Sequence, residues 1–232
     1  MSKERTIEGL SALGMRLFWT PVRQLSPDEV DKIHTICSDE ERQRYRQYRH
    51  EPSRQCFLVT RQLVRQTLSR LGSRQPQKWA FSTGPHGRPY LNNPTSELEG
   101  MDFNIAHSDR AVVLVVSSSG RVGVDLEPED RRVDHDLVAS QFFHPSERRA
   151  LKKLDGARRR RRFLELWVLK EAWMKADGRG IGAGLKEVVY RFDDANHPRL
   201  VHLPDGNAED WQVLLRRIDD HLLAVAQTSI SH

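Results

Sequence analysis

The order of helical and strand-like patterns along the chain is the feature that most restricts its fold. In each half of the 232 residues, a group of helical patterns is followed by strand-like patterns. This order is typical of an α+β protein in which neighbouring strands pair antiparallel. The seam is expected near residues 118–121, which predicts one lobe at residues 1–119 and a second at residues 120–232. The two halves share a layout, although no repeat is detectable in the residues themselves.

In the first half, the sequence predicts three helices. Ser-Pro-Asp-Glu at residues 26–29 and Ser-Asp-Glu-Glu at residues 38–41 have the residue types of capping boxes, so a helix should begin at each. A third helix is expected from about residue 52 to residue 71, where an apolar stripe recurs and Gly72 provides a stop. Strands are expected at residues 15–20, 79–82, 89–91, 103–105 and 111–117.

The second half opens with a strand expected at residues 122–127, after a turn at Gly120. Three helical patterns follow, and the last of them ends at Gly178. These helices are expected at residues 137–143, 145–154 and 160–176, and further strands at residues 188–192, 211–218 and 221–227.

The positive charge of the chain is unevenly distributed. The net charge is +5 and the isoelectric point is near 9.4. Basic faces attract polyanions such as nucleic acid, phosphorylated cofactors or acidic proteins, but they are about as often solvated helix faces. Charge by itself therefore does not choose a partner. The clustered arginines are Arg42, Arg44, Arg46, Arg49, Arg54, Arg61, Arg65 and the run Arg158–Arg162.

Apolar patterning and cysteine usage indicate a cytoplasmic protein. No apolar run approaches the length of a membrane span, and residues 1–10 lack the apolar core of a signal peptide. The two cysteines, Cys37 and Cys56, are too far apart for a local metal motif and lie in helical patterns. We expect both to be reduced, half-buried thiols.

Carboxylate and apolar side chains alternate along the strand expected at residues 122–127. Because side chains on a strand point alternately to its two faces, Asp125 and Glu127 share one face and the apolar residues between them point to the other. Oxygen ligands at this spacing suit Mg²⁺, which usually keeps waters and a substrate phosphate. A solvent-facing acidic strand end is the commoner explanation of an Asp-x-Glu pattern taken alone.

The helix expected at residues 160–176 carries a third carboxylate. Glu171 and Lys175 are four residues apart and so lie on one face of this helix. They are either an ordinary surface ion pair or an extension of the Asp125 site. In the second case Lys175 would face the anion that the metal holds and would neutralise charge on a leaving phosphate.

Two shorter segments carry groups suited to phosphate. His107 and Ser108 follow an expected strand and offer two donors, and Asn104 is placed to pin the loop. Arg88 lies in a turn beside the rigid Pro89. Each signal is weak alone, since a histidine at a strand end is more often structural than catalytic.

Taken together and in this order, the segments resemble the Sfp-type 4'-phosphopantetheinyl transferases. The resemblance includes the basic helices from Ser38 to Arg65 and extends to about residue 182. Two positions depart from the family pattern: Arg88 replaces a frequent lysine, and Ala106 replaces a frequent serine. The segments are Gly-Arg-Pro-Tyr at 87–90, Phe-Asn-Ile-Ala-His-Ser at 103–108, Gly-Val-Asp-Leu-Glu at 123–127, Phe-Phe-His-Pro-Ser-Glu at 142–147 and Trp-Val-Leu-Lys-Glu-Ala-Trp-Met-Lys at 167–175.

The resemblance implies a fold and a reaction. The fold is a monomer of two similar α/β lobes in a pseudo-twofold arrangement, with the active site at the lobe interface. The first lobe is expected to contact the nucleotide of coenzyme A, and the second to carry the metal site and the catalytic helix. The donor substrate is coenzyme A, the acceptor is a serine of an apo acyl-carrier or peptidyl-carrier protein, and the product is 3',5'-ADP.

The resemblance also implies roles for individual residues. Asp125, Glu127 and Glu171 are expected to hold Mg²⁺, with Mn²⁺ as a substitute. Lys175 is expected to neutralise or protonate the leaving group. The base is expected to be Glu171, acting directly or through a water on the metal, or else Glu147. The expected contacts to coenzyme A are Arg44, Arg65, Arg88, His107, Ser108, Asp125 and Lys175, with His107 as the candidate for the 3'-phosphate.

Acidic carrier proteins would explain the basic balance of the chain. The run Arg158–Arg162 is expected to steer the carrier, with a solvated helix start as the alternative. Phe142 and Phe143 are candidates for docking the carrier, and at least one of them is expected in the core. No nucleic-acid or membrane partner is expected, and the carrier's pathway stays open among fatty-acid, polyketide, nonribosomal-peptide and siderophore synthesis.

Three other functions remain as alternatives. A nucleic-acid-binding module would explain the arginines, but not the carboxylates Asp125, Glu127 and Glu171, which would repel a phosphate backbone. A metal-dependent nuclease or phosphohydrolase would share the acidic group and would not need to bind coenzyme A. An inactive scaffold that binds carriers would not need Lys175 and the three carboxylates intact.

Overall fold

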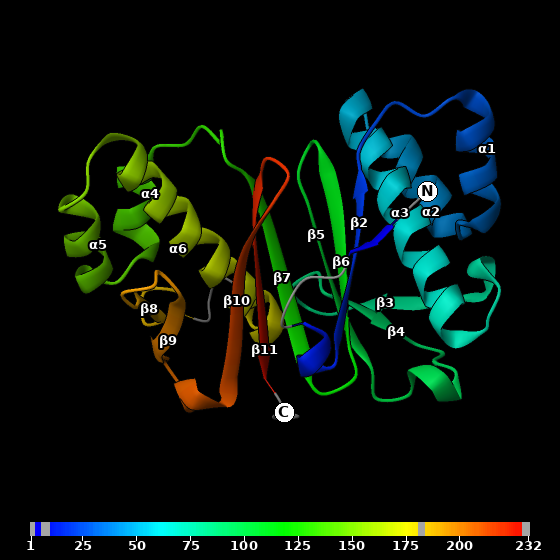
Figure 1. Ribbon diagram of the computed structural model, residues 1–232. Coiled ribbons are helices and arrows are strands. Elements are labelled where there is room, and N and C mark those ends of the chain that lie inside the picture. The colour runs from blue at the N-terminus through cyan, green and yellow to red at the C-terminus, as the bar shows by residue number, and fades with distance from the viewer. Residues whose placement is uncertain (1–2, 6–9, 181–183, 229–232) are drawn as a thin grey trace. The chain divides into compact units, whose positions relative to one another are not determined.

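The computed structural model of the protein describes residues 3–5, 10–180 and 184–228. The chain divides into two compact units, Met1–Ser119 and Gly120–His232, so the boundary coincides with the expected seam (Figure 1). Of the stretch assessed for a signal peptide, residues 1–2 and 6–9 lie outside the described residues, as do residues 181–182 at the end of the family resemblance. No helix among the described residues is long and apolar enough to cross a membrane.

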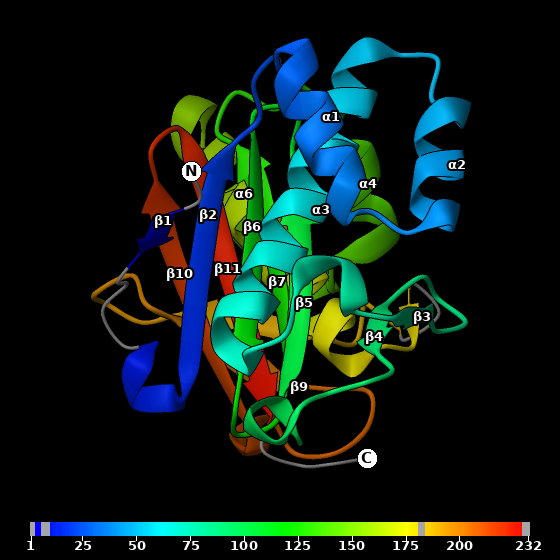
Figure 2. The same cartoon turned by 90° about the vertical axis from the view of Figure 1, so that its right-hand side faces the viewer.

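Unit 1 is a four-stranded antiparallel sheet with helices against one of its faces (Figure 2). The strand order is β1-β2-β6-β5, and α3 packs on the central strands β2 and β6. Its elements are β1 (Lys3–Arg5), β2 (Met15–Pro21), α1 (Pro27–Ile36), α2 (Asp39–Gln47), α3 (Glu51–Gly72), the hairpin β3 (Phe81–Thr83) and β4 (Pro89–Leu91), β5 (Asp102–His107) and β6 (Ala111–Ser117).

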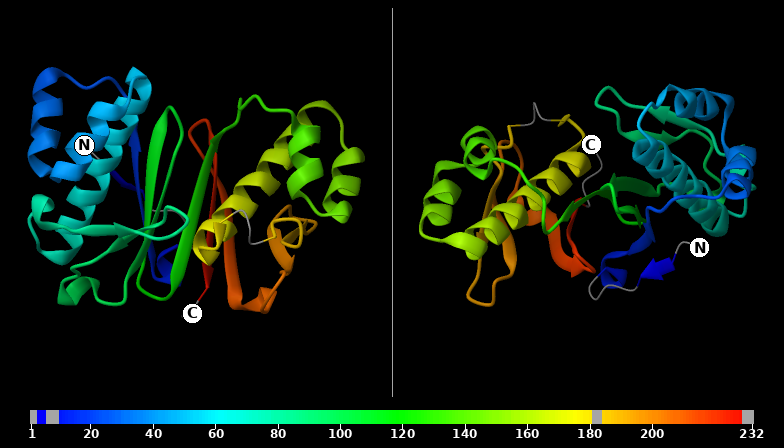
Figure 3. Two further views of the ribbon diagram at one scale, coloured as in Figure 1. Left: turned by 180° about the vertical axis from the view of Figure 1, so that it is seen from behind. Right: turned by 90° about the horizontal axis from the view of Figure 1, so that it is seen from above.

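Unit 2 is a three-stranded antiparallel sheet covered on one face by α6, which packs on β7 and β11 (Figure 3). The strand order is β10-β11-β7. Its elements are β7 (Arg121–Pro128), α4 (His135–Phe142), α5 (Pro145–Lys152), α6 (Gly156–Asp177), the hairpin β8 (Val189–Phe192) and β9 (Pro198–His202), β10 (Trp211–Ile218) and β11 (His221–Thr228).

The two units repeat one topology. Each has a strand, then three helices, then a short hairpin, then two long antiparallel strands. In each sheet the last strand lies between the first and the second-last, as β2-β6-β5 in unit 1 and β7-β11-β10 in unit 2. Unit 1 adds β1 at one edge. The α+β class is therefore confirmed, and the repeat is present in the topology although the residues do not reveal it.

The helices α1 and α2 begin at the two capping boxes that the sequence predicts. In α1, the Ser26 hydroxyl accepts the Glu29 N–H at 3.3 Å, and the Glu29 carboxylate accepts the Ser26 N–H at 2.9 Å. In α2, Ser38 and Glu41 form the same pair of bonds at 3.2 and 2.9 Å. Both capping boxes are therefore complete. Each satisfies two backbone N–H groups at the start of its helix that have no carbonyl partner within the helix.

Three local expectations differ from the structure. Gly72 is the last residue of α3 and does not form the left-handed cap, which falls on Ser73 at φ 51°. Gly72 instead packs closely on its neighbours, because an added Cβ would lie 2.6 Å from a side-chain methyl of Leu98, which would have to shift. The helix expected from residue 160 begins at Gly156, since its arginines are good helix formers. The sequence also missed β1 and β9, which are short edge strands.

Each unit has its own apolar core between helices and sheet. In unit 1, Leu58 and Leu63 of α3 belong to one cluster with Val112 and Leu114 of β6. In unit 2, the cluster joins α6 to β11 and includes small residues, Ala172 on the helix and Ala224 and Ala226 on the strand. Small side chains at this contact let the helix backbone approach the sheet closely.

Candidate active site

A glycine on β7 lets α6 lie close to the strand that carries Asp125 and Glu127. A Cβ added to Gly123 would lie 2.1 Å from the carbonyl oxygen of Ala172 and 2.4 Å from the amide nitrogen of Ala176. Both atoms belong to the backbone of α6, so no side chain can yield. Because strand residues alternate, Asp125 and Glu127 share the face of Gly123 and are directed toward α6. The tertiary contact thus places the Asp-x-Glu pattern against the helix of Glu171 and Lys175.

Asp125 is buried and only partly satisfied. Asp125 is 6% exposed, and Lys175 Nζ donates a hydrogen bond to Asp125 Oδ1 at 2.6 Å. Its other oxygen, Oδ2, is buried and accepts no hydrogen bond within the described part of the chain. A buried carboxylate oxygen without a donor is unfavourable, so this atom is suited to an additional positive ligand.

Glu171 has a strongly altered acidity. Burial raises its pKa from 4.5 to about 7, and the negative charge of Asp125 adds to the rise. The positive charges of Lys175 and Arg131 act in the opposite direction. A carboxyl with a pKa near neutrality is half protonated under ordinary conditions and can exchange a proton with a substrate.

Glu127 is held by two donors at the end of β7. Trp167 Nε1 donates to Glu127 Oε1 at 3.2 Å, and Arg131 forms an ion pair with the same oxygen. The Arg131 guanidinium also lies over the Trp167 ring, 5.5 Å from its centroid. Trp167 therefore positions the carboxylate and its cation together.

The three predicted metal ligands do not form a ready-made cluster. Among the described residues, no group of three or more histidine, cysteine, aspartate or glutamate side chains has the spacing of a metal site. Lys175 and Arg131 instead neutralise Asp125 and Glu127. Two observations nevertheless fit a hard cation: Asp125 Oδ2 has no donor among the described residues, and burial together with the charge of Asp125 raises the pKa of Glu171.

A pocket within unit 1 gathers three of the predicted phosphate contacts. Its volume is about 670 Å³, a size suited to a nucleotide-sized ligand. Arg44 of α2 lines it together with His107 and Ser108 at the end of β5. The remaining lining residues are Tyr48, His50, Pro52, Ser53, Cys56, Phe57, Thr60, Arg61, Thr83, Gly87, Pro89, Ile105 and Asp109.

The turn after β5 holds Ser108 in place. The Ser108 hydroxyl oxygen accepts the N–H groups of Arg110 at 3.0 Å and Ala111 at 3.1 Å. The same pocket contains an aromatic pair that the sequence reasoning missed, Tyr48 and Phe57, with ring centroids 5.5 Å apart. These two residues straddle the start of α3, so only the fold brings them beside His107.

The comparisons with known proteins follow this division into two units. A model described as the 4'-phosphopantetheinyl transferase superfamily matches residues 121–226, and one described as 4'-phosphopantetheinyl transferase, N-terminal, matches residues 18–119. A 4'-phosphopantetheinyl transferase of Bacillus subtilis is 30% identical over 186 residues, which are 80% of this chain and 79% of that protein. The chain belongs to the 4'-phosphopantetheinyl transferase family.

Other relatives agree with the assignment to the 4'-phosphopantetheinyl transferases. A provisionally assigned 4'-phosphopantetheinyl transferase of Synechocystis is 35% identical over 79% of this chain and 73% of its own. The solved structure of a holo-(acyl-carrier-protein) synthase from Bacillus anthracis, in complex with CoA (3',5'-ADP), covers 47% of this chain and 94% of its own at 22% identity, with a TM-score of 0.41. That likeness is too weak to add to the argument.

In this member of the transferase family, Glu147 is a buried structural group and not an available base. It is 3% exposed and pairs with the fully buried Lys170 at 2.9 Å. Its two oxygens also accept the N–H of Tyr190 at 2.9 Å and of His144 at 3.0 Å. Both carboxylate oxygens of Glu147 are thus occupied by protein groups, which argues against Glu147 as the base. The sequence carried the signal: His-Pro-Ser-Glu at 144–147 forms a capping box, as at 26–29.

Two residues predicted to contact phosphate in the transferase, Arg65 and Arg88, form ion pairs within the protein instead. Arg65 is 2% exposed, pairs with Glu41 at 2.9 Å and donates to backbone carbonyls, including that of Trp79 at 3.0 Å. Arg88 pairs with Asp102 at 2.5 Å and is 7% exposed. Neither residue lines the pocket of Arg44 and His107, so their ion pairs argue against the predicted phosphate contacts.

Most of the run Arg158–Arg162 is occupied by ion pairs within unit 2. Arg161 and Arg162 both pair with Glu165, at 3.0 and 2.9 Å, and Glu165 is 2% exposed. Arg158 pairs with Asp155 at 3.2 Å. A structural role therefore accounts for much of this run, which weakens the expectation that it steers a carrier.

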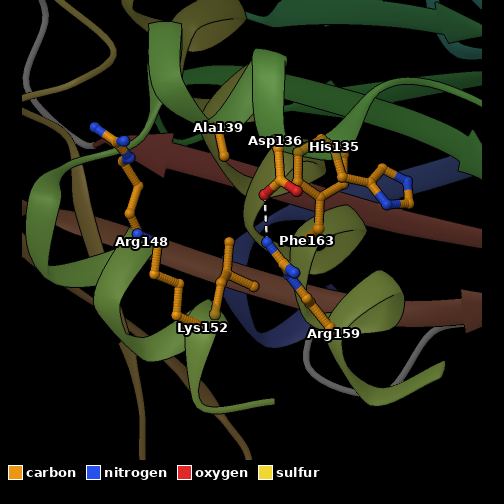
Figure 4. A pocket seen from close by; sticks show the side chains of 8 residues that line it. His135, Asp136, Ala139, Arg148, Lys152, Arg159 and Phe163 are labelled. Atoms are coloured by element: carbon orange, nitrogen blue, oxygen red, sulfur yellow. Dashed lines mark hydrogen bonds and ion pairs between the residues drawn. The ribbon is translucent and has the colours of Figure 1, made fainter. Parts of the chain in front are cut away.

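A separate cavity of about 370 Å³ lies among α4, α5 and α6 (Figure 4). Arg159 reaches across it to pair with Asp136, and Phe163 and Leu151 provide apolar lining. No residue predicted for the metal site, the base or the coenzyme A contacts lines this cavity.

Phe143, one of the two phenylalanines considered for carrier docking, belongs to the core. It is 1% exposed and stacks on Phe163 with ring centroids 5.2 Å apart.

Proposed function

We propose that this protein transfers the 4'-phosphopantetheine group of coenzyme A to a serine of an apo acyl-carrier or peptidyl-carrier protein. The serine oxygen forms a bond to the phosphorus attached to pantetheine, the bond from that phosphorus to the second phosphate breaks, and 3',5'-ADP leaves. The observation that carries the proposal is the Asp125–Lys175–Glu171 group on β7 and α6, in a chain of the transferase family. The reaction needs a proton acceptor and a cation for the leaving group, and this group supplies both.

Glu171 is our candidate for the base. With no divalent cation beside it, its pKa is about 7, close to the working pH; a cation held by the same carboxylates would lower this pKa and keep Glu171 deprotonated, the form that can accept a proton from the serine directly or through a water on the metal. The contacts of Glu147 with Lys170 and Tyr190 support this choice. Lys175, which Asp125 holds at 2.6 Å, is the candidate for neutralising the charge that develops on the leaving 3',5'-ADP.

The residues that would hold Mg²⁺, or Mn²⁺ in its place, are Asp125, Glu127 and Glu171. Such an ion would withdraw negative charge from the pyrophosphate of coenzyme A. Asp125 Oδ2, buried and without a donor in the described part of the chain, supports a cation at this position. Metal dependence is part of the proposal, and chelation tests it directly.

We propose that the pocket of unit 1 binds the nucleotide end of coenzyme A. Arg44 supplies a full positive charge, and His107 and Ser108 supply directional donors from one turn. His107 is exposed beside this turn and is assigned to the 3'-phosphate. That group distinguishes coenzyme A from ordinary adenine nucleotides.

The acidic carrier is proposed to dock on unit 2, where α5 presents Arg148 and Lys152. Both residues are exposed, line the cavity of Figure 4 and form no ion pair among the described residues. They are four residues apart and so lie on one face of the helix. They replace Arg158–Arg162 as the first candidates for steering, because most of that run is paired internally.

A cytoplasmic location remains part of the proposal. Cys37 and Cys56 are both buried free thiols, which suits a reducing compartment. No nucleic-acid partner is proposed, because Asp125, Glu127 and Glu171 would repel a phosphate backbone.

Intact-mass spectrometry of a purified apo-carrier protein, incubated with this chain, coenzyme A and Mg²⁺, tests the proposal. A mass gain of one phosphopantetheine group that EDTA prevents is the expected result. An unmodified carrier, tried with both an acyl-carrier and a peptidyl-carrier type, would refute it. Release of phosphate from coenzyme A without a carrier would then favour the phosphohydrolase alternative, and binding of the carrier alone would favour the scaffold.

A further inference from the structure

Arg131 lies in a turn that returns to the end of β7. Its N–H donates to the carbonyl of Pro128 at 3.0 Å, which closes the turn. Glu129 N–H donates to the carbonyl of Asp220 at 2.9 Å, which ties the turn to the hairpin of β10 and β11. The turn therefore holds the base of the Arg131 side chain at a fixed place beside Glu127.

The Arg131 guanidinium has two neighbours at this place. It pairs with Glu127 Oε1, and it lies 5.5 Å from the centroid of the Trp167 ring. Trp167 Nε1 donates to the same oxygen at 3.2 Å. One carboxylate oxygen thus accepts from both an indole and a guanidinium.

A metal ion and Arg131 would compete for Glu127. Two cations near one carboxylate repel each other, and the repulsion is strong where water is partly excluded. The Glu127 side chain is 16% exposed, whereas that of Arg131 is 31% exposed, so the arginine has room to move and the carboxylate has little. The Trp167 face remains as a seat for the guanidinium after it leaves Glu127, because cation–π contact does not need the carboxylate.

We propose that Arg131 is a built-in competitor of the metal: it pairs with Glu127 in the metal-free protein and must release this carboxylate when a divalent cation binds. The inference rests on the proposed function only in the assignment of Asp125, Glu127 and Glu171 to the cation. Its consequence is that Arg131 lowers the metal affinity of the protein in the absence of coenzyme A.

Binding of Mn²⁺ alone to the full chain, followed by the electron paramagnetic resonance signal of the free ion, tests the inference without coenzyme A. Arg131→Gln should bind Mn²⁺ about five-fold more tightly than the wild type, since the competing pair is partly exposed and of modest strength. The matched control is Arg132→Gln, which removes the same charge from the exposed neighbouring residue and should change the affinity less than about two-fold.

Three outcomes would overturn the inference: an unchanged or weaker affinity of Arg131→Gln, an equal gain in both variants, or no saturable Mn²⁺ binding by either Arg131→Gln or the wild type. A second readout is the rise in melting temperature on adding Mn²⁺, which should be larger for Arg131→Gln than for the wild type. The carrier-modification assay separates the two proposals. If the wild type modifies its carrier but Arg131→Gln binds Mn²⁺ no more tightly, the competitor role fails and the function stands. If the carrier stays unmodified while Arg131→Gln binds more tightly, the function fails and the competitor role stands.

Discussion

Replacing Glu171 by glutamine should stabilise the metal-free protein at high pH while abolishing carrier modification. Burial and the charge of Asp125 raise the pKa of Glu171 from 4.5 to about 7. At about 1.36 kcal/mol for each pKa unit, this rise corresponds to at most roughly 3 kcal/mol of unfavourable free energy for ionising this partly buried group. Glutamine has the same shape and cannot ionise, so Glu171→Gln removes this cost.

The sign follows from proton binding. Between pH 4.5 and about 7 the folded protein keeps a proton on Glu171 that the unfolded chain has lost. The free energy of unfolding contributed by this group therefore falls as pH rises through that window. We expect the wild type and Glu171→Gln to differ little at pH 4.5, and the variant to be more stable by up to about 3 kcal/mol at pH 8.

Urea unfolding at pH 4.5 and pH 8 in the presence of EDTA measures the difference, and comparing the two proteins cancels the titration of other groups. Mass spectrometry of an apo-carrier with Mg²⁺ measures the activity. A difference in stability that is the same at both pH values would refute the altered acidity of Glu171. Near-normal modification by the variant would remove Glu171 from the roles of ligand and base.

Four further predictions concern the close contact, the buried pair and the pocket. Gly123→Ala should cost about 1–3 kcal/mol in urea unfolding and lower carrier modification, because the added Cβ meets the α6 backbone; an unchanged stability would mean that α6 can move. Glu147→Gln should lower the free energy of unfolding by about 3 kcal/mol by leaving the buried Lys170 ammonium with backbone carbonyls but no carboxylate, whereas a folded variant with normal stability but no turnover would favour Glu147 as a base. His107→Ala should weaken binding of coenzyme A about ten-fold in calorimetry but not that of 3'-dephospho-coenzyme A, and equal losses would contradict its role. Coenzyme A should slow alkylation of Cys56, which lines the pocket, but not that of Cys37, and unprotected Cys56 would place the nucleotide elsewhere.

Local patterns in the sequence were reliable where a structure depends on residues a few positions apart. The capping boxes at 26–29 and 38–41 form as predicted, because each joins atoms within one helical turn. The shared face of Asp125 and Glu127 likewise follows from strand geometry alone. The pairing of Lys175 with Asp125 was not predictable from spacing, since it spans 50 residues and depends on the close approach at Gly123.

The sequence was misleading where a long charged side chain could choose among distant partners. The sequence favoured Arg88 for phosphate, with Arg44 and Arg65 as further candidates, yet of these three arginines Arg44 alone lines the pocket. Arg65 is drawn to Glu41 and Arg88 to Asp102, both of which lie on other elements. A buried arginine needs a carboxylate to offset its desolvation, and the fold decides which carboxylates are available.

The sequence by itself determined the α+β class, the order of the helices and longer strands, the seam near residue 119 and the residues that could carry chemistry. These properties depend on periodicity, caps and side-chain type, which are local. Only the tertiary structure decided which of those residues share a site. It gathered Arg44 with His107, set Asp125 against Lys175, and placed Arg131 on Glu127. The same folding that created these contacts buried Glu147 with Lys170, because a charge leaves water only where the chain brings it a partner.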